Sequence, residues 1–141
     1  ALILQEGQAK AGVLEALDLI EAQGLKIGLA TSSPFTMVEA VLGKLGIRDR
    51  FMAVHSAEVE RFGKPHPDVY IHAAEKLGVE PVHCLALEDS FTGLLAAKAA
   101  SMKALIVPDP ALVGDPRLAI ADHQLHSLAE LDADMLARWV A

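Results

Sequence analysis

The chain has 141 residues, of which 52% are hydrophobic and 22% charged, a composition typical of a folded domain that excludes a disordered segment. The net charge of −7 argues against DNA or RNA binding, because phosphate backbones favour clustered Lys and Arg and the 12 basic residues here are scattered. Charges or glycines interrupt every apolar run well before the roughly 18 residues that a membrane span needs. We therefore expect a soluble single domain over residues 1–141.

Cysteine usage points to a reducing compartment. Cys84 is the single cysteine and cannot form an internal disulfide, and residues 1–10 lack the basic start and apolar stretch of a secretion signal. We therefore expect the cytoplasm, with Cys84 as a small buried strand residue.

Helical and strand patterns alternate along the chain. Apolar residues at helical spacing, prolines at first helical positions and glycines after last turns mark the helices, and short apolar runs mark the strands. The sequence predicts helices over 10–23, 34–45, 67–77 and 90–100, with strands over 26–30, 51–54, 82–87 and 103–107. Residues 108–127 resemble a loop, after which Ser127 and Glu130 fit a capping box for a last helix ending near Trp139.

This alternation predicts the fold class. Strands separated by helices of ten or more residues pair in parallel, because a helix supplies the crossover that a parallel neighbour needs. We expect an α/β fold with a Rossmann-like, doubly wound parallel sheet. Ligands of such sheets bind outside the carboxyl ends of the strands, which is where the polar clusters of this sequence fall.

The first polar cluster, Thr31-Ser32-Ser33, follows a strand and opens a helix. Hydroxyls and free backbone N–H groups at a helix start form an anion site that suits a phosphate. Serine and threonine are also the commonest helix caps, so the cluster alone is a weak signal.

The second cluster is Gly63-Lys64-Pro65-His66-Pro67-Asp68, in which two prolines stiffen the backbone around one lysine. A cation held in a defined place can neutralise a transferring phosphoryl group. A solvated loop lysine is the alternative interpretation.

The third cluster places two carboxylates, Glu88 and Asp89, directly after an apolar strand and before Ser90. Adjacent carboxylates suit a hard, oxygen-seeking cation such as magnesium. Capping of the following helix by Asp89 or Ser90 is an equally good explanation from the local sequence.

The order of these clusters makes a family resemblance specific. Gly-Leu-Ala-Thr-Ser-Ser, Gly-Lys-Pro-His-Pro-Asp and Ala-Leu-Glu-Asp-Ser-Phe-Thr-Gly are similar to the second, third and fourth motifs of the haloacid dehalogenase superfamily. The sequence most resembles the branch that contains β-phosphoglucomutase and the hexitol and deoxyglucose phosphate phosphatases. By this resemblance, Thr31 and the Ser32 amide bind the transferring phosphoryl group and Lys64 neutralises its charge. Asp89, supported by Glu88, holds magnesium.

The family's nucleophile and its acid–base residue are absent from this sequence. Both belong to an Asp-x-Asp-Gly-Thr motif on an N-terminal strand, whereas the one Asp-x-Asp here, Asp132-Ala133-Asp134, is predicted to start a helix. In this branch the helical cap also precedes the second motif. The resemblance therefore implies the latter part of a longer enzyme, with a core that lacks its first central strand and its cap.

Loss of the central strand would leave two inner sheet edges unpaired, beside Thr31 and beside Glu88. The sheet could be completed in three ways: by Leu2-Ile3-Leu4 folding into the gap, by a partner chain, or by a separate N-terminal segment. We favour an incomplete chain, because Leu2–Leu4 would restore the pairing without supplying a nucleophile.

The histidines carry weaker signals. His123 and His126 are three residues apart but fall in or beside an expected loop with no third ligand nearby, which does not favour zinc. His55, His72 and His83 are isolated along the sequence, so we expect no common role for them.

The resemblance implies a magnesium-dependent phosphatase that hydrolyses a small sugar or polyol phosphate through an aspartyl-phosphate in the complete protein. Without the nucleophile, this chain alone is expected to be inactive. Two alternatives stay open: a β-phosphoglucomutase-like phosphotransferase, and a non-catalytic module that binds a phosphate or a partner chain. Pro34 favours hydrolysis, because the mutases typically have a substrate-contacting lysine at this place.

Overall fold

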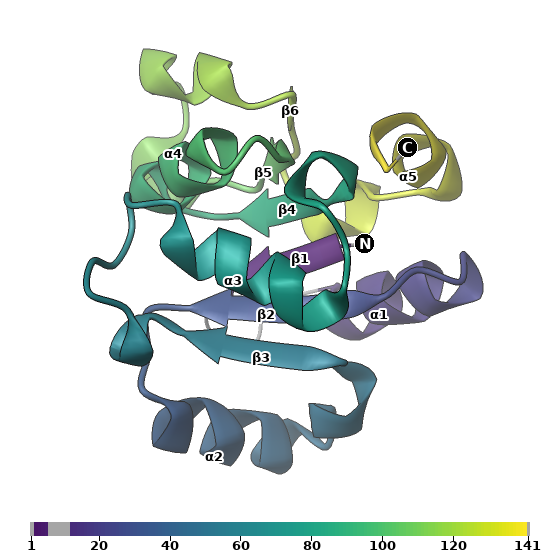
Figure 1. The fold of residues 1–141 in the computed structure, drawn as a ribbon. Helices are drawn as coiled ribbons and strands as arrows, with labels where there is room; N and C mark the ends of the chain where they lie inside the picture. The colour runs from purple at the N-terminus through teal and green to yellow at the C-terminus, as the bar shows by residue number, and fades with distance from the viewer. Residues whose placement is uncertain (1, 6–11, 141) are drawn as a thin grey trace.

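The computed structural model describes residues 2–5 and 12–140, and these form a six-stranded sheet in which all neighbouring strands are parallel (Figure 1). The strand order is β3-β2-β1-β4-β5-β6, so the chain winds outward from the centre in both directions. The predicted α/β, doubly wound parallel fold is confirmed. The strands are β1 (Leu2–Gln5), β2 (Ile27–Thr31), β3 (Ala53–Ser56), β4 (Leu85–Glu88), β5 (Lys103–Ile106) and β6 (His123–Gln124).

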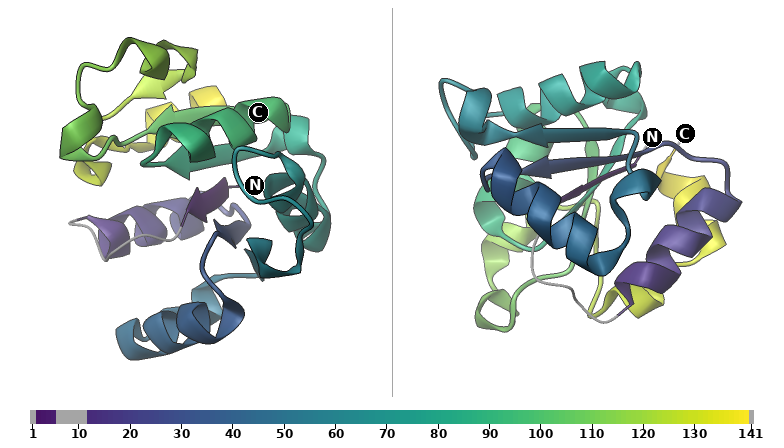
Figure 2. Two further views of the ribbon diagram at one scale, coloured as in Figure 1. Left: turned by 90° about the vertical axis from the view of Figure 1, so that its left-hand side faces the viewer. Right: turned by 90° about the horizontal axis from the view of Figure 1, so that it is seen from below.

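Helices cover both faces of the sheet (Figure 2). Helices α3 and α4 bury their apolar residues on one face, and α1, α2 and α5 bury theirs on the other. Strands β2, β3 and β4 are buried along their whole length because they are covered from both sides. The helices are α1 (Val13–Ala22), α2 (Phe35–Leu45), α3 (Asp68–Leu77), α4 (Phe91–Ala99) and α5 (Ala133–Trp139).

The central position of the sheet is occupied, which corrects the expectation of two unpaired inner edges. Strand β1 pairs with β2 through Leu2↔Ile27 to Gln5↔Ala30, and with β4 through Leu2↔Leu85 to Leu4↔Leu87. Of the possibilities left open by the sequence, the structure therefore contains the one in which Leu2–Leu4 fill the gap. The physical reason is hydrogen bonding, since an open slot would leave the backbone groups of two buried strands unsatisfied.

Several element boundaries differ from the sequence prediction. Strand β3 begins at Ala53 instead of Phe51, and β4 begins at Leu85 because Pro81–His83 form a 3-10 turn. Helix α2 begins at Phe35 and is capped by Glu58, whose carboxylate accepts from the Phe35 N–H at 2.9 Å. The expected start of the first helix at residue 10 lies outside the described residues.

The C-terminal part contains more structure than the sequence indicated. The predicted loop includes 3-10 turns and the short edge strand β6, which pairs with β5. The capping box prediction was wrong: the Ser127 side chain accepts from Ala129 N–H in a 3-10 turn, and Asp132 caps α5 by accepting from Met135 N–H at 2.8 Å. Asp132-Ala133-Asp134 does start a helix, as predicted.

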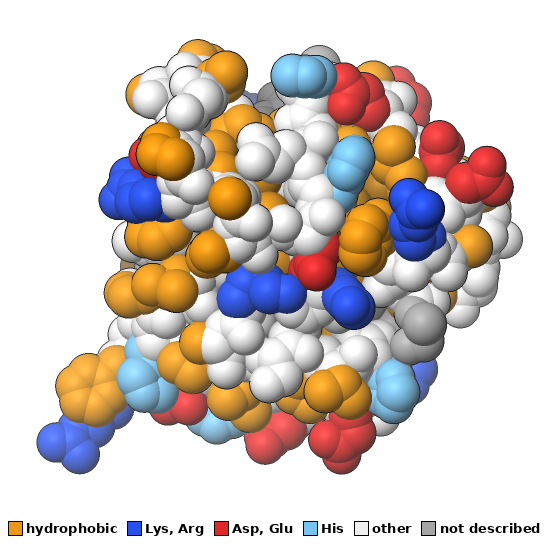
Figure 3. All heavy atoms as spheres, turned by 90° about the horizontal axis from the view of Figure 1, so that it is seen from above, with side chains coloured by type: hydrophobic (Ala, Val, Ile, Leu, Met, Phe, Trp, Pro, Cys, Tyr) orange, Lys and Arg blue, Asp and Glu red, His pale blue; other side chains and the backbone are white. Residues whose placement is uncertain are grey.

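The surface agrees with the scattered charge pattern of the sequence. On the face drawn in Figure 3, Lys and Arg side chains are interspersed with acidic and apolar ones and do not gather into one basic patch. Within the described part of the chain, every helix is too short or too polar to cross a membrane.

Candidate active site

The carboxyl ends of β2, β1 and β4 lie side by side at one edge of the sheet (Figure 1). The register places Gln5, the last residue of β1, opposite Ala30, one residue before Thr31. On the other side Leu4 pairs with Leu87, one residue before Glu88. Thr31 and Glu88 therefore end the two strands that flank the central strand, as the sequence predicted for this edge.

Thr31 ends β2 as a completely buried side chain. Its Oγ1 accepts a hydrogen bond from the Ser33 N–H at 3.0 Å, which folds the start of the following loop back onto the strand. The Ser56 hydroxyl at the end of β3 donates to the Ser33 carbonyl at 2.6 Å and so fixes the same loop from the neighbouring strand. Ser32, between the two anchored residues, is exposed.

Lys64 reaches from the loop before α3 into the same edge. Its side chain is only 4% exposed, and its Nζ lies 2.7 Å from Glu88 Oε1. The ammonium also lies 3.4 Å from the Ala30 carbonyl oxygen, next to Thr31. The structure thus joins the second cluster of the sequence to the first and the third, and Lys64 is a buried ion-pair partner instead of a solvated loop lysine.

Glu88 is the centre of this site. Its carboxylate is fully buried, and Oε1 accepts from both Lys64 and the Tyr70 hydroxyl, while Oε2 lies 3.3 Å from the Asp89 backbone nitrogen as acceptor. Burial and the neighbouring Glu88 charge raise the Tyr70 pKa well above its usual value, so the phenol stays protonated and donates. A buried carboxylate is stable only with such partners, because an unpaired charge costs several kcal/mol to desolvate.

The Glu-Asp-Ser-Phe-Thr-Gly sequence has a local physical explanation. Ser90 caps α4 by accepting from the Gly93 N–H at 3.1 Å, which turns the chain sharply after β4. Gly93 is required because a Cβ at this position would lie 2.1 Å from the Glu88 carboxyl carbon. Serine and glycine at this spacing therefore create the space in which the Glu88 carboxylate lies.

Magnesium fits this edge only in part. Both Glu88 oxygens are already engaged, so Glu88 acts in this arrangement as a partner of Lys64 and Tyr70, and Asp89 is the carboxylate beyond the strand tip. Among the described residues, the acidic pair does not belong to a group of three or more potential metal-ligating side chains. An ion held through Asp89 would take most of its oxygen ligands from water and substrate, which is common for magnesium.

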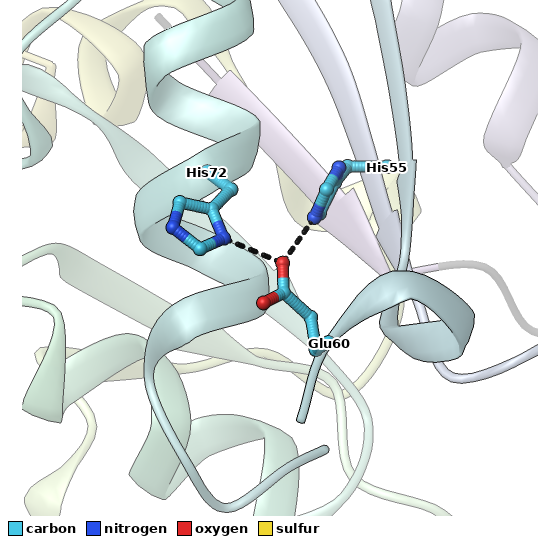
Figure 4. A group of neighbouring side chains, drawn as sticks. All are labelled: His55, Glu60 and His72. Atoms are coloured by element: carbon cyan, nitrogen blue, oxygen red, sulfur yellow. Dashed lines mark hydrogen bonds and ion pairs between the residues drawn. The ribbon is translucent and has the colours of Figure 1, made fainter. Parts of the chain in front are cut away.

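Two further interactions were not predicted from the sequence, one at this edge and one between β3 and α3. Tyr70 was recognised only as part of the apolar stripe of α3, and its contact with Glu88 is between residues 18 positions apart. The expectation that His55 and His72 are isolated was wrong, because both contact Glu60 (Figure 4). No periodic pattern marks these residues, since a strand, a loop and a helix contribute one each.

The described residues bring a hydroxyl, a buried lysine and an acidic pair to the carboxyl edge of a parallel α/β sheet. The family model described as haloacid dehalogenase-like hydrolase matches residues 1–101, and the chain belongs to this family. The predicted family is therefore confirmed.

Individual relatives agree with this assignment. Hexitol phosphatase B of Escherichia coli is 51% identical over 122 residues, which are 86% of this chain and 55% of that protein. The β-phosphoglucomutase of Bacillus subtilis is 34% identical over 125 residues, covering 89% of this chain and 52% of the relative. The crystal structure of CbbY from Rhodobacter sphaeroides in complex with phosphate has a TM-score of 0.79 and 30% identity, with 86% of this chain and 55% of that chain covered. The chain thus spans a little over half the length of these relatives.

Proposed function

We propose that the complete protein to which these residues contribute is a magnesium-dependent phosphatase of small sugar or polyol phosphates. The observation that carries the proposal is the buried Lys64–Glu88 ion pair, 2.7 Å long, between the ends of β2 and β4 and next to Thr31. A fixed ammonium beside a hydroxyl and backbone amides is an arrangement that binds and neutralises a phosphoryl group. The 51% identity to a hexitol phosphatase supports a sugar or polyol phosphate as the substrate class.

Each residue has a distinct part in this proposal. The Thr31 hydroxyl and the Ser32 amide bind phosphoryl oxygens, and Lys64 neutralises the charge that builds up during transfer. Glu88 holds Lys64 in place, and Tyr70 prevents the Glu88 carboxylate from turning away. Magnesium, held through Asp89 with Glu88 behind it, would supply further neutralisation of the phosphate when bound.

The nucleophile is the part that this chain does not supply. Strand β1 ends in Gln5, and a carboxamide is a poor nucleophile compared with the aspartate of the family motif. No Asp-x-Asp-Gly sequence occurs in the 141 residues. We therefore propose that the chain alone binds phosphate weakly and has no phosphatase activity, and that an aspartyl-phosphate forms only in the complete protein.

Hydrolysis is preferred over phosphoryl transfer between sugar positions. The 51% identity to the hexitol phosphatase exceeds the 34% identity to the β-phosphoglucomutase over similar lengths. Pro34, exposed at the start of α2, has no group that could hold a second phosphate, whereas the mutase pattern has a lysine there.

The cytoplasm is the proposed compartment, because Cys84 is free and buried and no disulfide is formed.

A chimera tests the function directly. In it, this chain replaces the matched part of E. coli hexitol phosphatase B, which supplies the remaining length. Phosphate release is measured over a panel of sugar and polyol phosphates, with magnesium and with EDTA. We expect magnesium-dependent release by the chimera, none by the chain alone, and a loss of at least about 100-fold in kcat/KM for Lys64→Met or Asp89→Asn.

Matched surface variants control for general damage. Lys44→Met and Asp134→Asn change the same residue types at exposed positions of α2 and α5 and should leave the rate unchanged. A folded chimera that releases phosphate from no member of the panel would refute the proposed function. Release by the chain alone that depends on Asp89 would refute the requirement for an external nucleophile.

A further inference from the structure

A second group of potential metal-ligating side chains lies between β3 and α3, apart from Thr31, Lys64, Glu88 and Asp89. His55 comes from β3, His72 from α3 and Glu60 from the segment between them, and the Glu60 carboxylate points between the two imidazole rings (Figure 4). Glu60 Oε1 lies 2.5 Å from His55 Nε2 and 2.5 Å from His72 Nδ1. The three ligand atoms all lie within 4.8 Å of one another.

We propose that His55, Glu60 and His72 form a binding site for a divalent transition-metal ion, zinc in particular. Two imidazole nitrogens and one carboxylate oxygen are a donor set that suits zinc and its neighbours, whereas magnesium prefers oxygen ligands alone. Three protein ligands leave one tetrahedral position for water, as in open zinc sites.

The spacing of the ligand atoms fits an ion after a small adjustment. Zinc–ligand bonds of about 2.0–2.1 Å in a tetrahedral site separate two ligand atoms by about 3.3 Å. The two observed separations of 2.5 Å are hydrogen-bond distances, so each ring would move outward by less than about 1 Å to admit the ion. The rings are already close, with centroids 5.7 Å apart and planes inclined by 79°.

Burial makes the group a formed site with one open side. The side chains of His55 and Glu60 are only 5% and 6% exposed, whereas His72 is 39% exposed. His55 shares its face of β3 with the buried Ala53, against which α3 packs, so the strand and the helix set the two imidazoles. The group is therefore open to solvent at His72, where an ion and its bound water can enter.

Hydrogen bonding alone does not satisfy this group. Both imidazoles contact the same oxygen of Glu60, and His55 Nδ1 is buried without a hydrogen-bond partner among the described residues. Without a bond at Nδ1, the His55 ring is not fixed on its far side and can shift its Nε2 toward an ion.

The local charge also suits a cation. Asp68 and Glu75 lie on α3 with His72, and their charges act on its imidazole. These two carboxylates add to the negative charge of Glu60 beside the proposed ion.

Such an ion would fasten the segment that carries Lys64. Glu60 precedes Lys64 by four residues, and His72 lies one helical turn inside α3, so an ion would connect the two ends of this segment to β3. The role is structural and does not depend on the phosphatase proposal, since none of its three ligands is among the residues proposed to bind phosphate or magnesium.

Zinc titration of the purified chain tests the site, with isothermal calorimetry in excess magnesium and Co²⁺ visible absorption as a second readout. We expect one zinc per chain, a melting temperature that rises with zinc concentration, and a ligand-field spectrum with Co²⁺. His72→Gln and Glu60→Gln should each weaken binding by at least about 100-fold, since even residues behind the ligands contribute 10- to 100-fold. His72 is the safer change because it is half-exposed, and circular dichroism checks that each variant folds.

The matched control is the double variant His123→Ala/His126→Ala, which removes the other closely spaced histidines and should bind zinc like the unaltered chain. The proposal is overturned if the unaltered chain binds no zinc at about 100 μM. It is also overturned if folded His72→Gln binds as tightly as the unaltered chain, or if binding is lost in the His123/His126 variant instead. Because phosphate release is not measured, these outcomes are separate from those for the proposed function.

Discussion

At the scale of single residues, Glu88 determines how the site is built. A buried carboxylate is unfavourable unless cations and donors surround it, and Glu88 has Lys64, Tyr70 and the Asp89 N–H. The same contacts hold Lys64 beside Thr31, and these two residues are the ones proposed to bind the phosphoryl group. The contacts that stabilise the buried Glu88 carboxylate therefore also hold the Lys64 ammonium in position.

Substitution of Gly93, which packs against the Glu88 carboxylate, tests the arrangement of Glu88 and its partners. Gly93→Ala would place a methyl group 2.1 Å from the Glu88 carboxyl carbon and displace the carboxylate, so we expect the free energy of unfolding to fall by about 1–3 kcal/mol or more. A methyl group added at Gly43, inside α2, would meet no atom of another element within 4 Å, so Gly43→Ala should instead stabilise by up to about 1 kcal/mol. Urea denaturation of the two variants measures both changes, and equal effects would show that the Glu88 contact does not limit position 93.

At the scale of elements, helix N-termini are capped either by the residue next to the helix or by a side chain from a distant segment. Ser90 caps its own helix α4, whereas α2 is capped by Glu58 from the segment after β3. The latter cap fastens the loop after Thr31 to the neighbouring strand, together with Ser56. These two long-range contacts make the loop after Thr31 part of the sheet edge.

The C-terminal helix gives a prediction that separates two possible caps. Asp132 accepts from Met135 N–H at 2.8 Å, so Asp132→Ala should destabilise the protein by about 0.5–2 kcal/mol. Ser127→Ala affects only a 3-10 turn and should cost less. Thermal unfolding of the two variants decides the order, and a larger loss for Ser127→Ala would support the capping box instead.

At the scale of the whole molecule, the far edge of the sheet depends on one acidic residue. Asp122, 18% exposed before β6, accepts from Lys98 of α4 at 2.8 Å and from the Ala104 N–H of β5 at 2.7 Å. Burial raises the Asp122 pKa, but these two donors and the Lys98 charge outweigh it, and the pKa lies below its usual value. The carboxylate thus joins a helix, a strand and the chain entering β6.

The lowered pKa of Asp122 determines how its contribution to stability changes with pH. Because the folded-state pKa of Asp122 is depressed, the unfolded state binds more protons in acid, and the stabilisation is full above about pH 5 and is lost as the pH falls through the folded-state pKa. We expect Asp122→Asn to remove about 1–2 kcal/mol at pH 7 and less at pH 3. Denaturation curves at both pH values measure this, and an equal loss at pH 3 and pH 7 would contradict the titration of Asp122.

The sequence by itself determined the parallel α/β class, because hydrophobic periodicity and the glycines at helix ends are local signals. Gly46 and Gly78 do adopt the left-handed conformation after α2 and α3. It also predicted Thr31, Ser32, Lys64, Glu88 and Asp89 as the candidate site, because the carboxyl ends of parallel strands meet at one edge and the three motifs resemble those of the family. Their catalytic roles remain part of the proposed function.

Only the tertiary structure decided which residues meet across the sheet. Leu2–Gln5 occupy the central position, Tyr70 donates to Glu88, and His55 and His72 meet at Glu60. None of these contacts has a periodic signature, because each joins residues from different elements whose distance depends on strand order and helix packing. Local sequence encodes the conformation of each element, whereas the burial of polar groups between elements selects their partners.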